Sequence, residues 1–400
     1  MTGPAALRAE LERALRERPF GVRWWDGGLL PATTDHGPVF DVRSAKAIGH
    51  LLRAPGQLGL GRAYVTGALD VDDMEAALEL VDTWRPSPLD ARQRARLAWA
   101  ATRAAGLRGL PRPVASELRP HGRLHTRARD RRAVTFHYDV SNEFFALFLG
   151  PSMTYSCAVF GRGAETLEQA QRAKHELVCA KLDVRRGQSL LDVGCGWGSF
   201  AIHAAGEHGV HVTGITLSRP QAALATQRAR EAGLADRVHV RVADWRELED
   251  EPFDAIASIG MVEHVGARNI DAYARRLAEL LRSGGRALNQ GIARLSASHP
   301  AASGPFTRHF IFPDGETLHL SRVQLAFERA GLVTEHVEGF AADYAETLRH
   351  WARRLDDHLD EARTIAGPER TRVWRLYLRA ARRGFETGYS SVYQVLARRP

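Results

Sequence analysis

Three glycines at alternate positions form the stretch of this sequence whose chemistry is easiest to read. The apolar segment 189–193 predicts a buried strand, Gly194, Gly196 and Gly198 follow it, and 199–205 predicts a helix. Glycines in a strand-to-helix turn let the backbone approach a ligand closely, and the first N–H groups of the helix point toward that ligand. The pattern is typical of nucleotide-like ligands, although plain tight turns share it.

The next predicted strand, 211–215, narrows the choice of ligand. In dinucleotide-binding folds this strand is followed, about 20 residues on from the glycines, by an Asp or Glu that holds the ribose. Here it ends in Thr216-Leu217-Ser218, with no acid. The absence disfavours a nicotinamide cofactor, and a dehydrogenase stays only as an alternative.

Strands and helices alternate from Ala133 onward, which predicts an α/β fold. A helix at 167–182 precedes the series. Such alternation implies a doubly wound, Rossmann-like parallel sheet with its ligand at the carboxyl ends of the strands. The predicted strands are 189–193, 211–215, 238–242, 253–259 and 286–290, the helices between them are 200–208, 219–232 and 270–281, a loop or lid is predicted at 293–315, and C-terminal helices at 341–363 and 369–396.

The N-terminal part has a different pattern. Short strands are predicted within 22–42 and a helix at 89–110, which indicates a smaller α+β domain. The Pro- and Arg-rich stretch 111–132 reads as a solvated linker or as a site for lipid phosphates. We therefore expect an N-terminal, lipid-associated domain at 1–110, a basic linker at 111–132 and the main domain at 133–400.

Composition bounds the location and the partners of the protein. The chain has 400 residues, 44% of them hydrophobic, and a formal net charge of +8, which favours an anionic partner such as a membrane surface. Cys157, Cys179 and Cys195 have no paired spacing, so neither a disulfide framework nor a metal site is predicted. No apolar stretch approaches the ~20 residues of a membrane span. We expect a cytoplasmic protein that touches the inner face of the membrane peripherally and binds no nucleic acid.

Several ordered motifs point to one family. The segments 137–139, 154–158, 191–198, 214–221, 260–265 and 311–315 together resemble the cyclopropane-fatty-acyl-phospholipid synthase family, mycolic acid cyclopropane synthases included. These are S-adenosylmethionine-dependent enzymes with a class I methyltransferase sheet. The resemblance covers the chain from Ala133 to its end, and 56–67 is similar to the N-terminal domain of the longer, phospholipid-acting members.

The resemblance implies a set of cofactor-binding residues. For Asp244, a helix N-cap before 245–249 is the alternative role. The residues implied are Tyr138, Tyr155 and Ser156 at the methionine end, Asp192, Gly194, Gly196, Gly198 and Gly260 around the turn beneath the cofactor, Thr216, Leu217, Ser218 and Gln221 on the ribose side, and Asp244 and Trp245 at the adenine.

The resemblance also implies a reaction, in which an acyl cis double bond of a membrane phospholipid attacks the activated methyl group. The resulting carbocation loses a proton and closes a cyclopropane ring, so a base must lie nearby. By resemblance that base is a bicarbonate held by the backbones of Cys157 and Ile292 together with Glu263 and Tyr344.

Gln290 stands where the family usually has a bicarbonate-binding histidine. Glutamine can donate a hydrogen bond but cannot titrate, which keeps a methylene-branched product open. Methylation of a small soluble molecule and a non-catalytic lipid-binding module are further alternatives, and the family resemblance leads us to expect a homodimer.

Overall fold

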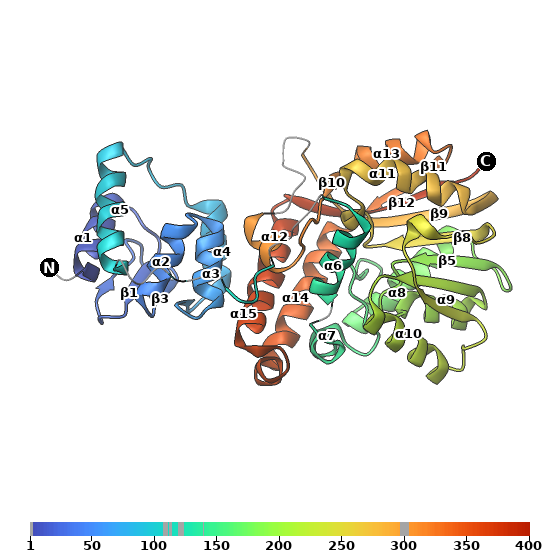
Figure 1. Ribbon diagram of the computed structural model, residues 1–400, viewed down its shortest axis with the longest axis horizontal. Coiled ribbons are helices and arrows are strands. Elements are labelled where there is room, and N and C mark those ends of the chain that lie inside the picture. Colours follow the sequence, from blue (N-terminus) through green and yellow to red (C-terminus); the bar gives the residue numbers. More distant parts are fainter. Residues whose placement is uncertain (1–2, 107–110, 112–113, 119–123, 139, 297–303) are drawn as a thin grey trace. The chain divides into compact units, whose positions relative to one another are not determined.

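The computed structural model describes residues 3–106, 111, 114–118, 124–138, 140–296 and 304–400 of the chain, with only the backbone of Val134 and Tyr138 (Figure 1). The chain divides into two compact units. The first comprises Met1–Leu118, Gly304–Phe310 and Ala366–Arg383, and the second comprises Arg119–Ser303, Ile311–Ile365 and Gly384–Pro400. The first unit thus takes two segments from the C-terminal half of the sequence. The linear division at 1–110, 111–132 and 133–400 stays a prediction.

The first unit is a small α+β body whose four-stranded sheet has the order β2-β1-β3-β4. Trp24 and Val42 are buried at its core with helix residues such as Ile48. Its elements are α1 (Gly3–Ala14), β1 (Gly21–Trp24), β2 (Leu29–Leu30), β3 (Val39–Val42), α2 (Ala45–Arg53), α3 (Gln57–Val65), β4 (Leu69–Val71), α4 (Met74–Thr83), α5 (Ala91–Ala105) and α12 (Pro305–Phe310), with the middle of α15 (Leu359–Glu386).

Two later segments of the chain are anchored inside this first unit. The ring of Phe306 lies so close to Gly61 that a Cβ there would come within 2.3 Å of it. Arg372 donates to the carbonyl oxygens of Tyr64 at 2.5 Å and Leu69 at 2.9 Å. These contacts join α12 and α15 to the N-terminal residues within one core.

The second unit is built on an eight-stranded sheet of order β11-β12-β9-β8-β5-β6-β7, with β10 paired to β9. Strands β5 to β9 are parallel, and β11 and β12 add antiparallel strands at one side. The elements are α6 (Arg127–Tyr138), α7 (Asn142–Leu149), α8 (Leu167–Leu182), β5 (Ser189–Val193), α9 (Ser199–His208), β6 (His211–Thr216), α10 (Arg219–Glu231), β7 (Val238–Val242), the 3₁₀ turn η1 (Trp245–Glu247), β8 (Phe253–Ile259), α11 (Val262–Glu279), β9 (Leu281–Arg294), β10 (Leu318–His319), α13 (Leu320–Arg329), β11 (Val333–Gly339), α14 (Ala341–Asp357) and β12 (Ser390–Arg398).

Helices cover both faces of this sheet, as doubly wound folds require. Helices α8, α9 and α10 enclose a core with one face, and α11 and α13 enclose a core with the other. Leu190 and Leu191, adjacent in β5, point to opposite faces and are both fully buried. Because both faces of the sheet are buried, the sequences of its central strands are nearly continuous apolar segments and do not alternate between apolar and polar residues.

Three expectations about elements were wrong. The predicted helix at 369–396 ends at Glu386, and residues 390–398 form β12, an inner strand between β9 and β11. The segment predicted as a loop or lid contains α12, and its residues 297–303 lie outside the described part. Strand β9 starts at Leu281, which the sequence assigned to a helix.

The stretch predicted as a solvated linker is partly helical and partly buried. Residues from Arg127 onward form α6, and the Arg129 side chain is only 11% exposed. Glu117, 1% exposed, pairs with Arg62 at 2.6 Å and with His309 at 2.6 Å inside the first unit. Among the described helices, none is long and apolar enough to cross a bilayer.

Candidate active site

The glycine turn after β5 lies at the switch point of the sheet, since β5 pairs with β6 on one side and β8 on the other. Gly194, Gly196 and Gly198 have φ values of 80°, 54° and 79°, where L side chains are strained. A Cβ on Gly194 would lie 2.6 Å from the Met261 sulfur, whereas a Cβ on Gly196 would meet no atom within 4 Å. Gly194 is therefore required by packing, and the space beside Gly196 is open to a ligand.

The loop after β6 is held in shape by its own side chains. The Thr216 hydroxyl donates to Gln221 Oε1 at 2.7 Å, and the Gln221 backbone N–H donates to Ser218 Oγ at 3.3 Å. Thr216, Leu217 and Gln221 line the cavity above the sheet, while Ser218 caps α10 just behind them. The loop is thus preorganised to meet a ligand.

Asp244 and Trp245 form the opposite wall. The Asp244 carboxylate caps η1 and accepts from the Arg246 guanidinium at 2.7 and 2.8 Å. Burial acts to raise the pKa of Asp244, but the hydrogen bonds and the charge of Arg246 together outweigh it and lower that pKa. The capping role weighed as an alternative is present, together with an ion pair that the sequence reading missed although its partner is two residues away.

A buried polar group forms the wall nearest Tyr155 and Ser156. The Lys174 ammonium donates to Ser156 Oγ at 3.0 Å, and burial lowers its pKa to about 8. Burial raises the pKa of Asp192 to about 7, against the opposing charge of Lys174, and its Oδ2 has no hydrogen-bond partner among the described residues. Lys174 was not predicted as a site residue, because nothing local marks a helical lysine as buried.

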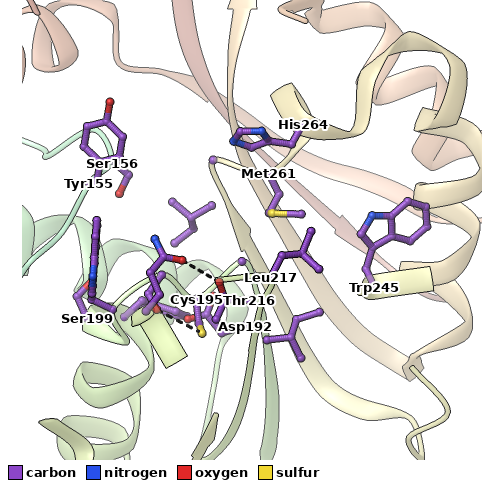
Figure 2. Close-up of a pocket in the computed structure, with 18 of the residues that line it drawn as sticks. Tyr155, Ser156, Asp192, Cys195, Ser199, Thr216, Leu217, Trp245, Met261 and His264 are labelled. Atoms are coloured by element: carbon purple, nitrogen blue, oxygen red, sulfur yellow. Dashed lines mark hydrogen bonds between the residues drawn. The ribbon is translucent and has the colours of Figure 1, made fainter. Parts of the chain in front are cut away.

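These walls enclose one cavity of about 130 Å³. Figure 2 shows Tyr155 and Ser156 on one side, Trp245 on the other, Cys195 and Thr216 below and Met261 and His264 above. Of the predicted cofactor residues, those lining it are Tyr155, Ser156, Asp192, Gly194, Gly196, Thr216, Leu217, Gln221, Asp244, Trp245 and Gly260. Tyr138 ends α6, and its side chain lies outside the described part.

A flap made of α6 and the segment 311–315 contributes further lining residues, among them Asp130 and Asp314. The Arg129 guanidinium binds Asp314 through two contacts of 2.5 and 2.6 Å. Arg246 reaches from η1 to Asp130 at 2.8 Å. Ion pairs therefore join the two parts of the flap, α6 and segment 311–315, to each other and join α6 to the wall that carries Trp245.

Glu263 lies in the first turn of α11, two residues after Met261. Its Oε1 accepts from the Ile292 backbone N–H at 2.6 Å, and its buried Oε2 has no hydrogen-bond partner among the described residues. Burial raises the pKa of Glu263 to about 7, with the Ile292 N–H acting in the opposite direction. Near neutral pH this side chain can exchange a proton.

None of the predicted catalytic residues, Glu263 included, lines the cavity itself. The Gln290 amide oxygen accepts from Gln394 at 2.9 Å in the middle of the sheet. Cys157 is buried, and its thiol donates to the Ala158 carbonyl at 3.1 Å. Tyr344 is half-buried with its ring centroid 6.2 Å from that of Trp351.

Trp351 connects Tyr344 to the cavity wall. The Tyr155 ring lies 5.2 Å from the same Trp351 ring. Trp351 therefore separates Tyr344 from Tyr155 in the cavity wall. Gln290 is instead hydrogen-bonded to Gln394 within the sheet.

A doubly wound sheet with a glycine turn at its switch point, polar loops at its carboxyl ends and a cavity above them defines a class I S-adenosylmethionine-dependent methyltransferase. The chain belongs to the mycolic acid cyclopropane synthetase family, whose model matches residues 125–395. Its members modify lipids, so this protein is a lipid-modifying methyltransferase of that family. The dehydrogenase alternative is thereby excluded.

Similar proteins agree with this assignment. The chain is 40% identical to a probable fatty acid methyltransferase of Mycobacterium tuberculosis, covering 97% of this chain and 93% of the relative. It is 30% identical to a tuberculostearic acid methyltransferase of the same organism, covering 96% and 88%. The solved mycolic acid cyclopropane synthase CmaA1 complexed with SAH and CTAB is 34% identical, covers 67% of this chain and 98% of that chain, and has a TM-score of 0.64.

Proposed function

We propose that the enzyme transfers the methyl carbon of S-adenosylmethionine to the cis double bond of an unsaturated acyl chain of a membrane phospholipid and forms a cyclopropane ring. The observation that carries this proposal is Glu263, a buried carboxyl group with one unpartnered oxygen, in the same helical turn as Met261 and His264, which line the cofactor cavity. Methyl transfer to an alkene produces a cation that must lose a proton, and a positioned base of matched pKa meets that need.

The cavity suits the proposed cofactor. Open space beside Gly196 and Gly260 leaves room for it, since a Cβ on either would meet no atom within 4 Å. The unpartnered Asp192 carboxylate is complementary to an ammonium group, and the Trp245 ring, 8% exposed, offers a face for an aromatic base. Tyr155 and Ser156 would flank the same ligand.

Bound S-adenosylmethionine, held between Tyr155, Asp192 and Trp245, would supply a methyl group activated by its sulfonium sulfur, which would leave as the neutral thioether. Glu263 then accepts a proton from the added methyl group, and the electrons of that C–H bond close the ring. The Ile292 N–H, 2.6 Å from Oε1, holds the carboxylate so that Oε2 is the free acceptor. Tyr155 and Trp245 help to exclude water, which would otherwise capture the cation.

The residues expected to hold bicarbonate fit that anion poorly. The Ile292 N–H already donates to Glu263, and the Gln290 amide oxygen accepts a hydrogen bond from Gln394 in the sheet, away from the cavity lining. We therefore route no step through bicarbonate and assign the proton to Glu263 itself.

A methylene-branched product is the second candidate. Gln290 cannot titrate, and two relatives that cover nearly the whole chain are named fatty acid and tuberculostearic acid methyltransferases. In this variant a hydride shift precedes proton loss, so the same base serves both outcomes.

The membrane also belongs to the proposal. A net charge of +8 supports docking on an anionic lipid surface from the cytoplasmic side, which would give the cavity access to acyl chains. A homodimer is part of the same expectation.

The test incubates the purified protein with methyl-deuterated S-adenosylmethionine and vesicles of a monounsaturated phospholipid. We expect labelled fatty acid that has lost one of the three deuterons, as the proton transfer to Glu263 requires. Deuterium NMR of the product distinguishes the two outcomes: a high-field signal identifies the cyclopropane ring, and a signal in the vinylidene region identifies the methylene-branched product. Label that keeps all three deuterons, or none in lipid, contradicts the proposal.

A further inference from the structure

A second group of reactive side chains lies away from the cavity, where α8 packs against α9. Cys179, His203 and His208 each place one potential ligand atom within 4.8 Å of the others. The Glu176 carboxylate joins them, with Oε1 2.9 Å from His203 Nε2 and Oε2 3.1 Å from His208 Nε2. None of these four residues lines the cavity.

Two rigid helices supply this group. Glu176 and Cys179 are three residues apart on α8 and therefore share a face. His203 lies in the middle of α9, and His208 is its last residue. Placement on regular helices fixes the Cα positions and leaves side-chain rotation as the freedom needed to gather the four groups.

The contact between Glu176 and His203 is not a hydrogen bond. The two atoms are 2.9 Å apart, yet His203 Nε2 is buried and has no partner of hydrogen-bond geometry among the described residues. The His203 nitrogen is therefore left to take another partner on the side that faces Cys179 and His208.

The donor groups lie in a sheltered position between the two helices. Cys179 is 1% exposed, and His203 and His208 are partly buried. A metal ion bound there would displace the proton of the thiol.

We propose that Cys179, His203, His208 and Glu176 bind one zinc ion between α8 and α9. One sulfur, two imidazole nitrogens and one carboxylate oxygen form a four-ligand set that zinc accepts in tetrahedral geometry. With Zn–S of about 2.3 Å and Zn–N of about 2.0–2.1 Å, the donor atoms would lie roughly 3.3–3.6 Å apart. The Cys179, His203 and His208 atoms would therefore approach one another, and the Glu176 carboxylate, now 2.9 Å from His203 Nε2, would move slightly away. Rotation of the side chains supplies this approach.

A closed set of four protein ligands indicates a structural ion. The ion would clamp two helices that also build the cavity, because α8 carries Lys174 and α9 begins at the glycine turn. Arg172 and Glu207 form an ion pair of 2.5 Å between the same helices, exposed and correspondingly weak. The zinc ion would be the stronger link.

The test strips the purified full-length protein with a chelator and reloads it with zinc or cobalt. We expect one equivalent per chain by mass spectrometry of the metal content, and a thiolate-to-cobalt charge-transfer band in the near ultraviolet. Cys179→Ser should abolish the band although Cys157 and Cys195 remain, because Cys179 is the proposed sulfur ligand. His203→Gln should weaken cobalt binding by at least ~100-fold. His239→Gln, at an exposed position in β7, is the matched control and should bind as the wild type does.

A thermal measurement covers variants that fold poorly. Zinc should raise the Tm of the stripped wild type and of His239→Gln, but not that of His208→Gln. Failure of the wild type to retain metal against a weak chromogenic chelator would overturn the proposal. A cobalt band that survives Cys179→Ser would do the same, because it would place the ion elsewhere. Neither result bears on the methyl-transfer proposal, which the lipid assay tests separately.

Discussion

Replacing Glu263 with glutamine should lower activity and raise stability at the same time. The glutamine oxygen can still accept from the Ile292 N–H, so the local geometry is kept. The variant cannot take up a proton, and loss of a general base costs roughly 10²–10⁴-fold in kcat. Affinity for S-adenosylhomocysteine should stay nearly unchanged, because Glu263 does not line the cofactor cavity.

The stability gain follows from the raised pKa. Burial moves the pKa of Glu263 from 4.5 to about 7, which corresponds to roughly 3 kcal/mol at ~1.36 kcal/mol per pKa unit. Below pH 4.5 the group is protonated in both folded and unfolded chains and costs nothing. Between pH 4.5 and 7 the unfolded chain ionises first, so the cost grows, and above pH 7 it is complete. Glu263→Gln removes this cost at alkaline pH.

Two assays check this prediction. Methyl transfer to phospholipid vesicles gives kcat, and urea unfolding at pH 5 and pH 8 gives the free energy of unfolding. Glu279→Gln, exposed near the end of the same helix, is the control and should change neither. Turnover within tenfold of the wild type, or an advantage in unfolding free energy that does not grow with pH, would refute the assignment of Glu263 as a buried base.

Three further substitutions test the cavity. Gly196→Ala should weaken S-adenosylhomocysteine binding at least tenfold by calorimetry, whereas Gly233→Ala, also left-handed and in open space, should cost only the ~1–2 kcal/mol of backbone strain; equal binding by both would contradict a ligand beside Gly196. Asp192→Asn should raise the free energy of unfolding more at pH 8 than at pH 5, because burial raises the pKa of Asp192 to about 7 and so disfavours its ionised form in the folded chain; an advantage in urea unfolding that does not grow with pH would contradict this reasoning. Gln290→His should keep activity and shift the product toward the ring, and an unchanged product ratio by NMR would count against any role for this position.

The local parts of the fold were predictable from the sequence. The strand 189–193, its glycine turn and the helix 167–182 have the predicted bounds, because strand, turn and cap signals are encoded within a few residues. Strand β12 was not predictable in this way. Buried on both faces, it shows no alternation, and an apolar run after a long helix cannot be told from its continuation.

In the candidate site, too, residues that belong to local motifs were predictable and residues defined by distant contacts were not. Eleven of the cofactor residues implied by the family resemblance line the cavity, because that resemblance rests on short motifs that can be read locally, most of them at the ends of strands. Lys174 and Arg129 escaped notice because their partners, Ser156 and Asp314, are distant in the sequence. A charged residue within a helix or a basic stretch is usually exposed to solvent, so its burial can be recognised only from the tertiary structure.

The discontinuous first unit limits how this enzyme can be dissected or exchanged between relatives. Cutting the chain near residue 118 would not release a self-contained catalytic fragment, because 304–310 and 366–383 would lose the partners they pack against. Phe306 would lose Gly61, and Arg372 would lose the carbonyls of Tyr64 and Leu69. The fragment would expose surface that is buried in the intact chain and would therefore tend to aggregate. An N-terminal unit exchanged between relatives would need to be accompanied by its own versions of segments 304–310 and 366–383.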